Sequence, residues 1–171
     1  HNSKFASFAL IAKGNYQYEL NITYPFSLVT TEGNEEPIKI FPAYWFTYNM
    51  FAIVRNNFKF KERDKRVIKV QNIETDFLAP DSISEILSAI KKIYLLIGAK
   101  LASSNKKEES ELIKTGKIYC LSKKEEIELF DKDAMNKFGG VIIKPVRAIK
   151  EYIAMSKYFS FRTLLDYLDL K

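Results

Sequence analysis

The residues best suited to chemistry form a polar stripe within the stretch from Pro42 to Arg66. They are two amides and three cations at or near helical spacing: Asn49, Arg55, Asn56, Lys59 and Arg63. Because residues three and four positions apart share a face of a helix, these side chains would form one line. Arginine forks match phosphate oxygens, and amides add hydrogen bonds. The stripe is therefore a candidate site for an anionic ligand.

A helix from Pro42 to about Lys61 is expected to carry this stripe. Its first half is apolar on almost every side, and a helix of that kind is normally buried. Asn49 is then expected inside the protein, where an amide needs hydrogen-bond partners. Phe58 and Phe60 are expected in the core. The alternative is structural: a satisfied core amide is followed by a solvated helix end, and Arg55, Arg63 and Asp64 form an ion-pair network.

The only histidine, His1, is the candidate catalytic residue. It precedes three polar residues, Asn2, Ser3 and Lys4, and imidazole is the natural general base near neutral pH. The alternative is that His1 is structural or incidental.

Several common sites are excluded by the sequence. It contains no GxGxxG, no GxxxxGK[ST] and no GxSxG, so neither common nucleotide loop nor a nucleophile elbow is present. One histidine and one cysteine cannot form an ordinary zinc site, so no metal and no cofactor is predicted. The lone Cys120 excludes an internal disulfide, fits a reducing cytoplasm, and is expected to be a small buried hydrophobe.

Composition indicates one domain, or a domain with an appendage. The chain has 171 residues, is 47% hydrophobic and carries a formal charge of +6 that is spread along its length. No apolar run approaches the ~18 residues that span a membrane, and no signal peptide is evident. Since the chain begins at His1 and not at methionine, we expect a fragment of a longer protein. In the basic run from Lys59 to Lys69, acidic residues dilute the charge, so nucleic acid is the weakest of the partners considered.

The expected fold class is α+β, mostly α, with a β-rich segment at 1–41 and a helical domain at 42–171. Strict alternation predicts a strand from Tyr16 to Tyr24. Further strands are expected in His1–Ala12, Phe26–Val29 and Ile38–Phe41.

The second part is expected to be mainly helical. A capping box at Ser82 begins a long amphipathic helix that reaches about Ala102. The remaining expectations are an ambiguous stretch at Leu112–Leu121 with a strand at Lys117–Leu121, a short helix from Ser122 to about Phe130, and a helix from Pro145 that bends near Ser160 and continues as a final amphipathic helix.

Two stretches resemble a known family: HNSKFASFALIAKGNYQYELNITYPFSLV and PAYWFTYNMFAIVRNNFKFKERDKR. They resemble the C-terminal part of an uncharacterised bacterial family of hexapeptide-repeat proteins, found in Bacteroidetes and spirochaetes. Its members are often labelled sugar-nucleotide pyrophosphorylase-like or hexapeptide transferase. The likeness covers Asn2 to Pro80 well and the later helices loosely. FASFALIAKGNY departs from the family's pattern, because it lacks the regular aliphatic and small residues of a hexapeptide repeat.

The resemblance implies that His1 to about Tyr24 is the last coil, or the cap, of a left-handed β-helix. The helix from Pro42 would cross its open end, and His1 would be the base. The polar stripe would line a cleft for a sugar nucleotide or another anion, and the chain would form homo-oligomers through the β-helix. Three hypotheses follow: part of a transferase acting on a sugar-nucleotide or acyl donor, a non-catalytic cap and oligomerisation module, or a nucleic-acid binder.

Overall fold

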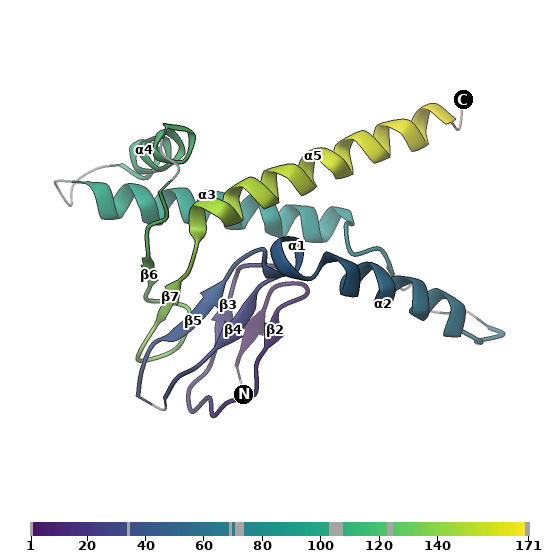
Figure 1. Ribbon diagram of the computed structural model, residues 1–171, viewed down its shortest axis with the longest axis horizontal. Coiled ribbons are helices and arrows are strands. Elements are labelled where there is room, and N and C mark those ends of the chain that lie inside the picture. Colours follow the sequence, from purple (N-terminus) through teal and green to yellow (C-terminus); the bar gives the residue numbers. More distant parts are fainter. Residues whose placement is uncertain are drawn as a thin grey trace.

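The chain is a mixed α/β protein, about half helical, with short strands first and long helices later (Figure 1). The computed structural model describes residues 2–33, 35–68, 70, 74–102, 108–122 and 125–169. The expected fold class, with most regular structure in helices, is confirmed. The boundary predicted at 41/42 stays a prediction.

The first four strands form two parallel pairs, and in each pair the strands are separated by one other strand in the sequence. β1 (Lys4–Phe5) pairs with β3 (Asn21–Ile22), and β2 (Leu10–Ile11) pairs with β4 (Leu28–Thr30). Paired residues are 17 apart in the first pair and 18 apart in the second. The chain therefore makes one coil of 17 to 18 residues, which brings β3 beside β1 and β4 beside β2. The alternation predicted from Tyr16 to Tyr24 gives alternating burial, but only Asn21–Ile22 is hydrogen-bonded as a strand.

Strands β2 and β4 belong to a five-stranded sheet, which also contains β5 and two strands from much later in the sequence. β5 (Ile38–Phe41) runs antiparallel to β4, β7 (Gly140–Ile142) runs parallel to β5, and β6 (Leu129–Asp131) forms the edge antiparallel to β7. The order is β2-β4-β5-β7-β6. Residues from both predicted segments thus share one sheet.

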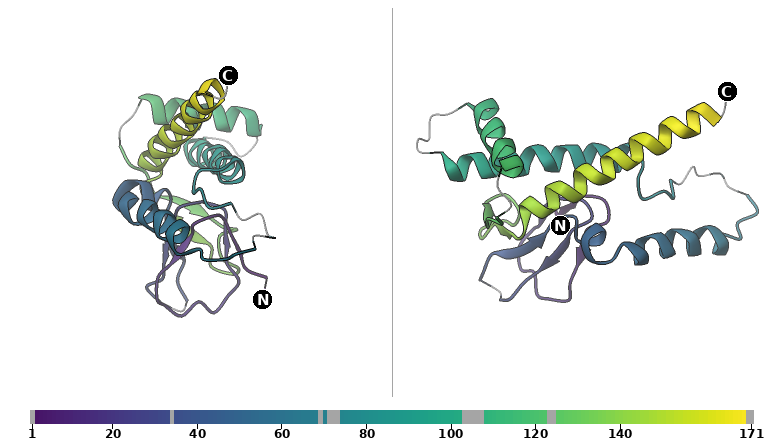
Figure 2. Two further views of the ribbon diagram at one scale, coloured as in Figure 1. Left: turned by 90° about the vertical axis from the view of Figure 1, so that its right-hand side faces the viewer. Right: turned by 45° about the horizontal axis from the view of Figure 1, so that its top comes forward.

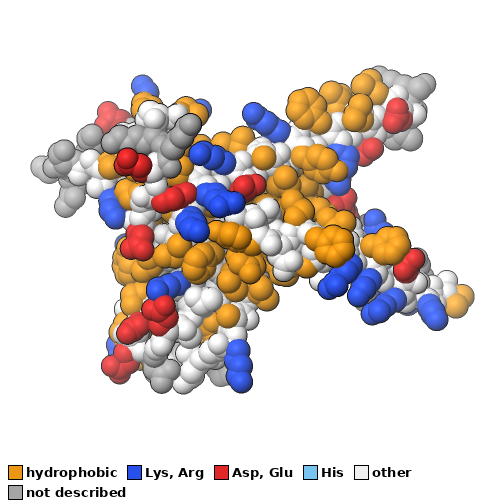
Figure 3. Space-filling view, viewed as in Figure 1, with side chains coloured by type: hydrophobic (Ala, Val, Ile, Leu, Met, Phe, Trp, Pro, Cys, Tyr) orange, Lys and Arg blue, Asp and Glu red, His pale blue; other side chains and the backbone are white. Residues whose placement is uncertain are grey.

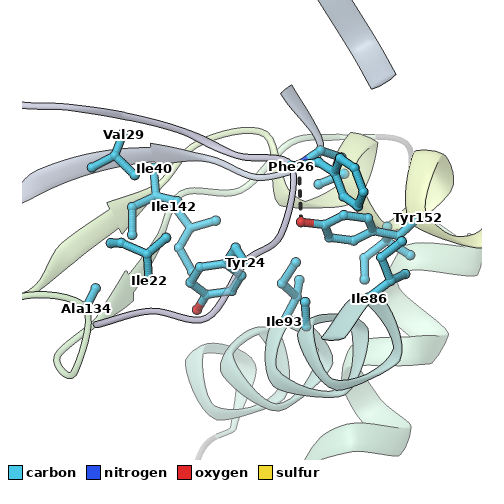
Figure 4. Packing of buried hydrophobic residues seen from close by; sticks show 14 of the residues in the cluster. Ile22, Tyr24, Phe26, Val29, Ile40, Ile86, Ile93, Ala134, Ile142 and Tyr152 are labelled. Atoms are coloured by element: carbon cyan, nitrogen blue, oxygen red, sulfur yellow. Dashed lines mark hydrogen bonds between the residues drawn. The ribbon is translucent and has the colours of Figure 1, made fainter. Parts of the chain in front are cut away.

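The core lies between this sheet and α3 (Pro80–Leu101). Residues on one face of the strands are fully buried, including Ile40 and Ile142, and they face Ile86 and Ile93 of α3 (Figure 4). Burying each such side chain stabilises the fold by about 1.5–3 kcal/mol. The helix predicted from Ser82 is confirmed, but it begins two residues earlier, and the predicted role of Ser82 as N-cap is wrong. Ser82 is the third residue of the helix, where its hydroxyl accepts a hydrogen bond from the N–H of the N-cap residue Ala79 at 3.0 Å.

α4 (Glu109–Ser122) packs on α3 at two glycines. A Cβ atom on Gly98 would overlap the backbone of Leu112, and one on Gly116 would overlap the backbone of Tyr94. The strand predicted at Lys117–Leu121 is wrong, because close packing of this segment against α3 favours a helix there.

Three predicted boundaries are corrected. The helix expected from Pro42 is two helices, α1 (Tyr44–Tyr48) and α2 (Met50–Arg63), because Asn49 has a non-helical φ of −147°. No helix begins at Ser122, where α4 ends; residues 123–124 lie outside the described part, and strand β6 follows at Leu129. The bend near Ser160 is absent from α5 (Pro145–Asp169), in which the Ser160 hydroxyl donates to the Ser156 carbonyl within one helix.

Two arms project from the body on the same side: α2, and the C-terminal part of α5 from about Tyr158 (Figures 1 and 2). Fully buried residues of α5 end at Tyr152, Phe159 still packs against the core, and Arg162 contacts Asp76 and the Leu78 carbonyl, both at 2.8 Å. In α2 the buried residue is Ile53. At ~1.5 Å per residue the α5 arm from Tyr158 to Asp169 is roughly 18 Å long. No helix in the described ranges has both the length and the apolar content that a membrane crossing requires.

Candidate functional site

The predicted stripe lies on the α2 arm, at the surface. Asn49 is exposed at the junction of α1 and α2, where its N–H donates to the Trp45 carbonyl at 3.0 Å. The expectation of a buried amide is therefore wrong. Phe58 and Phe60, expected in the core, are 61% and 44% exposed. The physical reason is the same for all three residues: no layer of the described chain covers the outer faces of α2.

Three of the five predicted ligand residues line one open hollow of about 630 Å³. We call it the basic hollow, and its lining residues are Asn56, Lys59, Phe60, Arg63, Asp64 and Arg66. Asn49 and Arg55 are not among them. The structure thus brings together the later half of the stripe and leaves the earlier half outside.

One ion pair is built into the basic hollow. Arg66 donates two hydrogen bonds to Asp64, from Nε at 2.7 Å and from Nη2 at 2.8 Å. The hydrogen bond to Asp64 raises the pKa of Arg66 above its usual value, so this guanidinium keeps its charge. The structural alternative placed Asp64 with Arg55 and Arg63, whereas here the Asp64 carboxylate is bonded by Arg66.

A second, smaller cavity of about 290 Å³ adjoins the first. We call it the aromatic hollow; its lining residues are Phe8, Trp45, Ile53, Asn56, Asn57, Phe60, Glu74, Thr75 and Phe77. Asn56 and Phe60 line both hollows. The indole N–H of Trp45 donates to the Phe8 carbonyl at 2.9 Å, which fixes one wall.

The aromatic hollow was not predicted from the sequence. Its walls come from the loop after β1, from α1 and α2, and from the segment before α3, so no local spacing connects them. One signal was present: Asn56 and Asn57 are adjacent amides in a helix of mostly apolar and basic residues.

Asn57 is incompletely satisfied. Its Oδ1 atom is buried and has no hydrogen-bond partner among the described residues. An unpaired buried acceptor costs about 1–3 kcal/mol, and such groups in folded proteins call for an explanation. Because Asn57 lines the aromatic hollow, a ligand bound there is a candidate partner for its Oδ1 atom.

His1 lies outside the described residues, so its predicted catalytic role stays a prediction. No group of three or more potential metal ligands occurs in the part of the chain that the structure describes.

A different polar cluster is buried in the core, and it was not predicted. Asp131 forms an ion pair with Lys92 at 2.6 Å and accepts a hydrogen bond from the Tyr24 hydroxyl at 2.8 Å. Burial, and then the charge of Asp131, raise the pKa of Tyr24 far above its ordinary value, so Tyr24 remains a neutral donor. Each member of the cluster has a partner, which is the arrangement expected of a structural network.

Tyr152 is a second buried tyrosine with a structural role. Its hydroxyl donates to the Pro25 carbonyl at 2.6 Å and accepts from the Ala43 N–H at 3.2 Å. Figure 4 shows the Tyr152 ring beside Phe26 and Ile86. Burial raises its pKa well above the usual value. These bonds connect α5 to the residue shortly before β4, Pro25, and to the residue shortly after β5, Ala43.

Comparison with known proteins places the chain beside a spirochaete relative. Ninety residues, 53% of the chain, are 52% identical to an uncharacterized protein of Treponema pallidum (strain Nichols), and the aligned part covers 12% of that protein. The chain therefore corresponds to a small share of the length of that relative. No family model matches the chain, and no solved structure matches it.

Proposed function

We propose that the chain is a non-catalytic cap and assembly module that associates with a second copy of itself through its α5 arm. The observation that carries this proposal is the α5 arm itself, which has no buried residue after Tyr152 and displays large apolar side chains. They are Tyr158, Phe161, Leu164, Leu165, Tyr167 and Leu168. Contiguous exposed apolar patches of this kind mark interaction sites.

The spacing of these side chains fits a helix as the partner. Tyr158, Phe161, Leu165 and Leu168 follow a 3-4-3 spacing, which is the seam pattern of packed helices. A seam on one copy is complementary to the same seam on another copy, and closed symmetric dimers are the commonest oligomers.

Charge favours an antiparallel pair of arms. Lys157 lies toward the body, and Asp166 and Asp169 lie toward the tip. Arg162 is engaged within its own chain, by Asp76 and the Leu78 carbonyl. In an antiparallel pair Lys157 of one arm lies nearer the acidic tip of the other. Such complementarity orients an association.

The capping half of the proposal is supported by the first strands. Parallel pairs at spacings of 17 and 18 residues are the geometry that one coil of a β-helix would have. In the described ranges β1 pairs with β3 alone and β2 with β4 alone, so each has an edge on which a preceding coil would pair.

The experiment compares the mass in solution of the parent chain and two variants by light scattering. Leu165→Glu with Leu168→Glu places charges in the seam, and we expect a dimer to become a monomer with an unchanged circular dichroism spectrum. Leu121→Glu, on α4 and also highly exposed, is the matched control and should leave the dimer intact. A parent chain that is monomeric at every concentration would overturn the proposal.

A second candidate function is binding of a phosphate-bearing ligand in the basic hollow, as part of a transferase. The observation in its favour is that Asn56, Lys59 and Arg63 line one hollow. Thermal unfolding with pyrophosphate, sugar nucleotides or acyl-CoA tests it, because a ligand at about 100 times its Kd should stabilise by ~2.7 kcal/mol. Shifts that persist in Lys59→Ala and Arg63→Ala would contradict it.

A further inference from the structure

We propose that the aromatic hollow and the basic hollow form one site for a nucleotide, with its heteroaromatic ring in the aromatic hollow and its phosphates in the basic hollow. This inference deepens the second candidate function and rests on it. It adds the ring-binding half, which the predicted stripe did not include.

The two hollows lie next to each other along α2 and share lining residues. Ile53, Asn56, Asn57 and Phe60 line the aromatic hollow, and Asn56, Lys59, Phe60 and Arg63 line the basic hollow. The two sets overlap and are offset by about one helical turn, ~5 Å. A single ligand can therefore contact both, with Asn56 and Phe60 at the point where they meet.

The aromatic hollow has the surfaces that stack on a flat ring. Phe8, Trp45, Phe60 and Phe77 contribute four aromatic rings. Phe8 is itself held by stacking on Phe26, with ring centroids 4.8 Å apart and planes at 10°. The volume of about 290 Å³ lies near the lower end of small-molecule pockets, which run from roughly 300 to 1,000 Å³. Bases of every kind stack on such platforms.

The polar groups of the aromatic hollow favour a ring that carries hydrogen-bonding atoms. The Asn57 amide has an unpaired Oδ1, and an amide offers both an acceptor and two donors. The Glu74 carboxylate, which accepts from the Asp76 N–H at 2.8 Å, also lines the hollow. A purine or pyrimidine can pair with these groups, whereas a hydrocarbon ring would leave them unpaired.

The basic hollow has the charge that phosphates require. Lys59, Arg63 and Arg66 outnumber the one acid, Asp64, which leaves two positive charges in surplus. Lysine and arginine side chains line the lower arm, α2, beside apolar ones (Figure 3). The combination suits a nucleoside monophosphate or diphosphate.

The only tryptophan of the chain, Trp45, provides the direct readout. A ring that enters the aromatic hollow changes its fluorescence, and this change gives a Kd for each probe. The probes are UDP and ADP, uridine and adenosine, and the ring-free anions ribose 5-phosphate and pyrophosphate. Each is titrated into the purified chain, with calorimetry as a second measure of binding.

We expect UDP or ADP to bind at least about tenfold more tightly than pyrophosphate, in line with the measured contribution of base stacking on aromatic side chains. Arg63→Ala should weaken nucleotide binding about tenfold or more while leaving the weak binding of the nucleoside unchanged. Lys61→Ala removes an exposed charge from the same helix outside both hollows and is the matched control.

Each other outcome has a definite meaning. If pyrophosphate binds as tightly as the nucleotides and Trp45 fluorescence does not change, the phosphate site stands and the ring site is overturned. If nothing binds, both are overturned. If an oligonucleotide binds far more tightly than any mononucleotide and its affinity falls steeply with salt, the nucleotide proposal is overturned in favour of nucleic-acid binding.

Discussion

The core around α3 and the two arms differ in how many of their apolar side chains are covered and how many of their polar groups have partners. In the core, apolar faces of the sheet and of α3 cover each other, and the buried Asp131 has both Lys92 and Tyr24 as partners. The arms carry nearly half of the exposed large apolar side chains of the described residues, and α2 adds a run of cations. The core therefore accounts for stability, and the arms are where we expect binding.

Removal of the buried carboxylate should have the largest effect on the core. Asp131→Ala removes the carboxylate shared by the Lys92 ammonium and the Tyr24 hydroxyl, and Lys92 keeps the Thr23 hydroxyl as an acceptor at 3.1 Å. Loss of one member of a buried pair costs about 3–5 kcal/mol of unfolding free energy. Urea denaturation measures it. Asp133→Ala is the control, because Asp133 hydrogen-bonds to Asp131 through its backbone N–H, which the substitution keeps. A loss as small as that of the control would contradict the account.

The α3–α4 contact should respond next. Gly98→Ala places a methyl group against the backbone of Leu112, which cannot move aside as a side chain can. Overpacking of this kind costs about 1–3 kcal/mol. Gly33→Ala is the control, because its new methyl group would meet only the Glu36 side chain, at 3.6 Å. Equal stability of the two variants in urea would show that the helices are not in close contact.

Cys120 tests how well α4 covers the edge of the core. Burial raises the pKa of the Cys120 thiol to about 11 from 9.0, so the folded protein holds its proton to higher pH than the unfolded chain does. The thiolate is the reactive form, and alkylation at pH 8 should be roughly tenfold or more slower than in denatured protein. The associated stability is present below pH 9 and is lost as pH rises toward 11. Equal alkylation rates in folded and denatured protein would contradict this.

Charges placed on the arms should change stability least. Val54→Lys on α2 alters a half-exposed side chain that supports no layer of the described fold. The expected change in the unfolding free energy of the protomer is within about 0.5 kcal/mol. A loss of more than 2 kcal/mol in urea would mean that the outer face of α2 is packed within the protomer.

Periodicity predicted those elements whose partners lie in the same chain. The strand at Ile38–Phe41 and the helix from Ser82 could be found because each has one apolar face that the core covers. Periodicity shows which face of a helix excludes water, but not what covers it. For that reason Phe58 and Phe60 were assigned to the core, and Asn49 was expected to be buried.

The candidate site was half predictable for a related reason. Lys59 and Arg63 lie on one face of one helix, so their spacing alone brings them together. Phe8 and Phe77 reach the same helix only through the fold, and no spacing in the sequence encodes that approach. Likewise, the pairing of Lys92 with Asp131 joins α3 to a strand that sequence patterns did not identify.

Hydrogen exchange along α5 tests most directly whether the arms are covered in solution. An isolated, uncovered helical arm is only marginally stable and exchanges its amide hydrogens quickly. At high protein concentration we predict that amides of residues 163–169 are protected nearly as well as those of residues 145–152, and that dilution removes the protection from 163–169 alone. Fast exchange of 163–169 at every concentration, with 145–152 still protected, would contradict the claim that the α5 arm is an assembly surface.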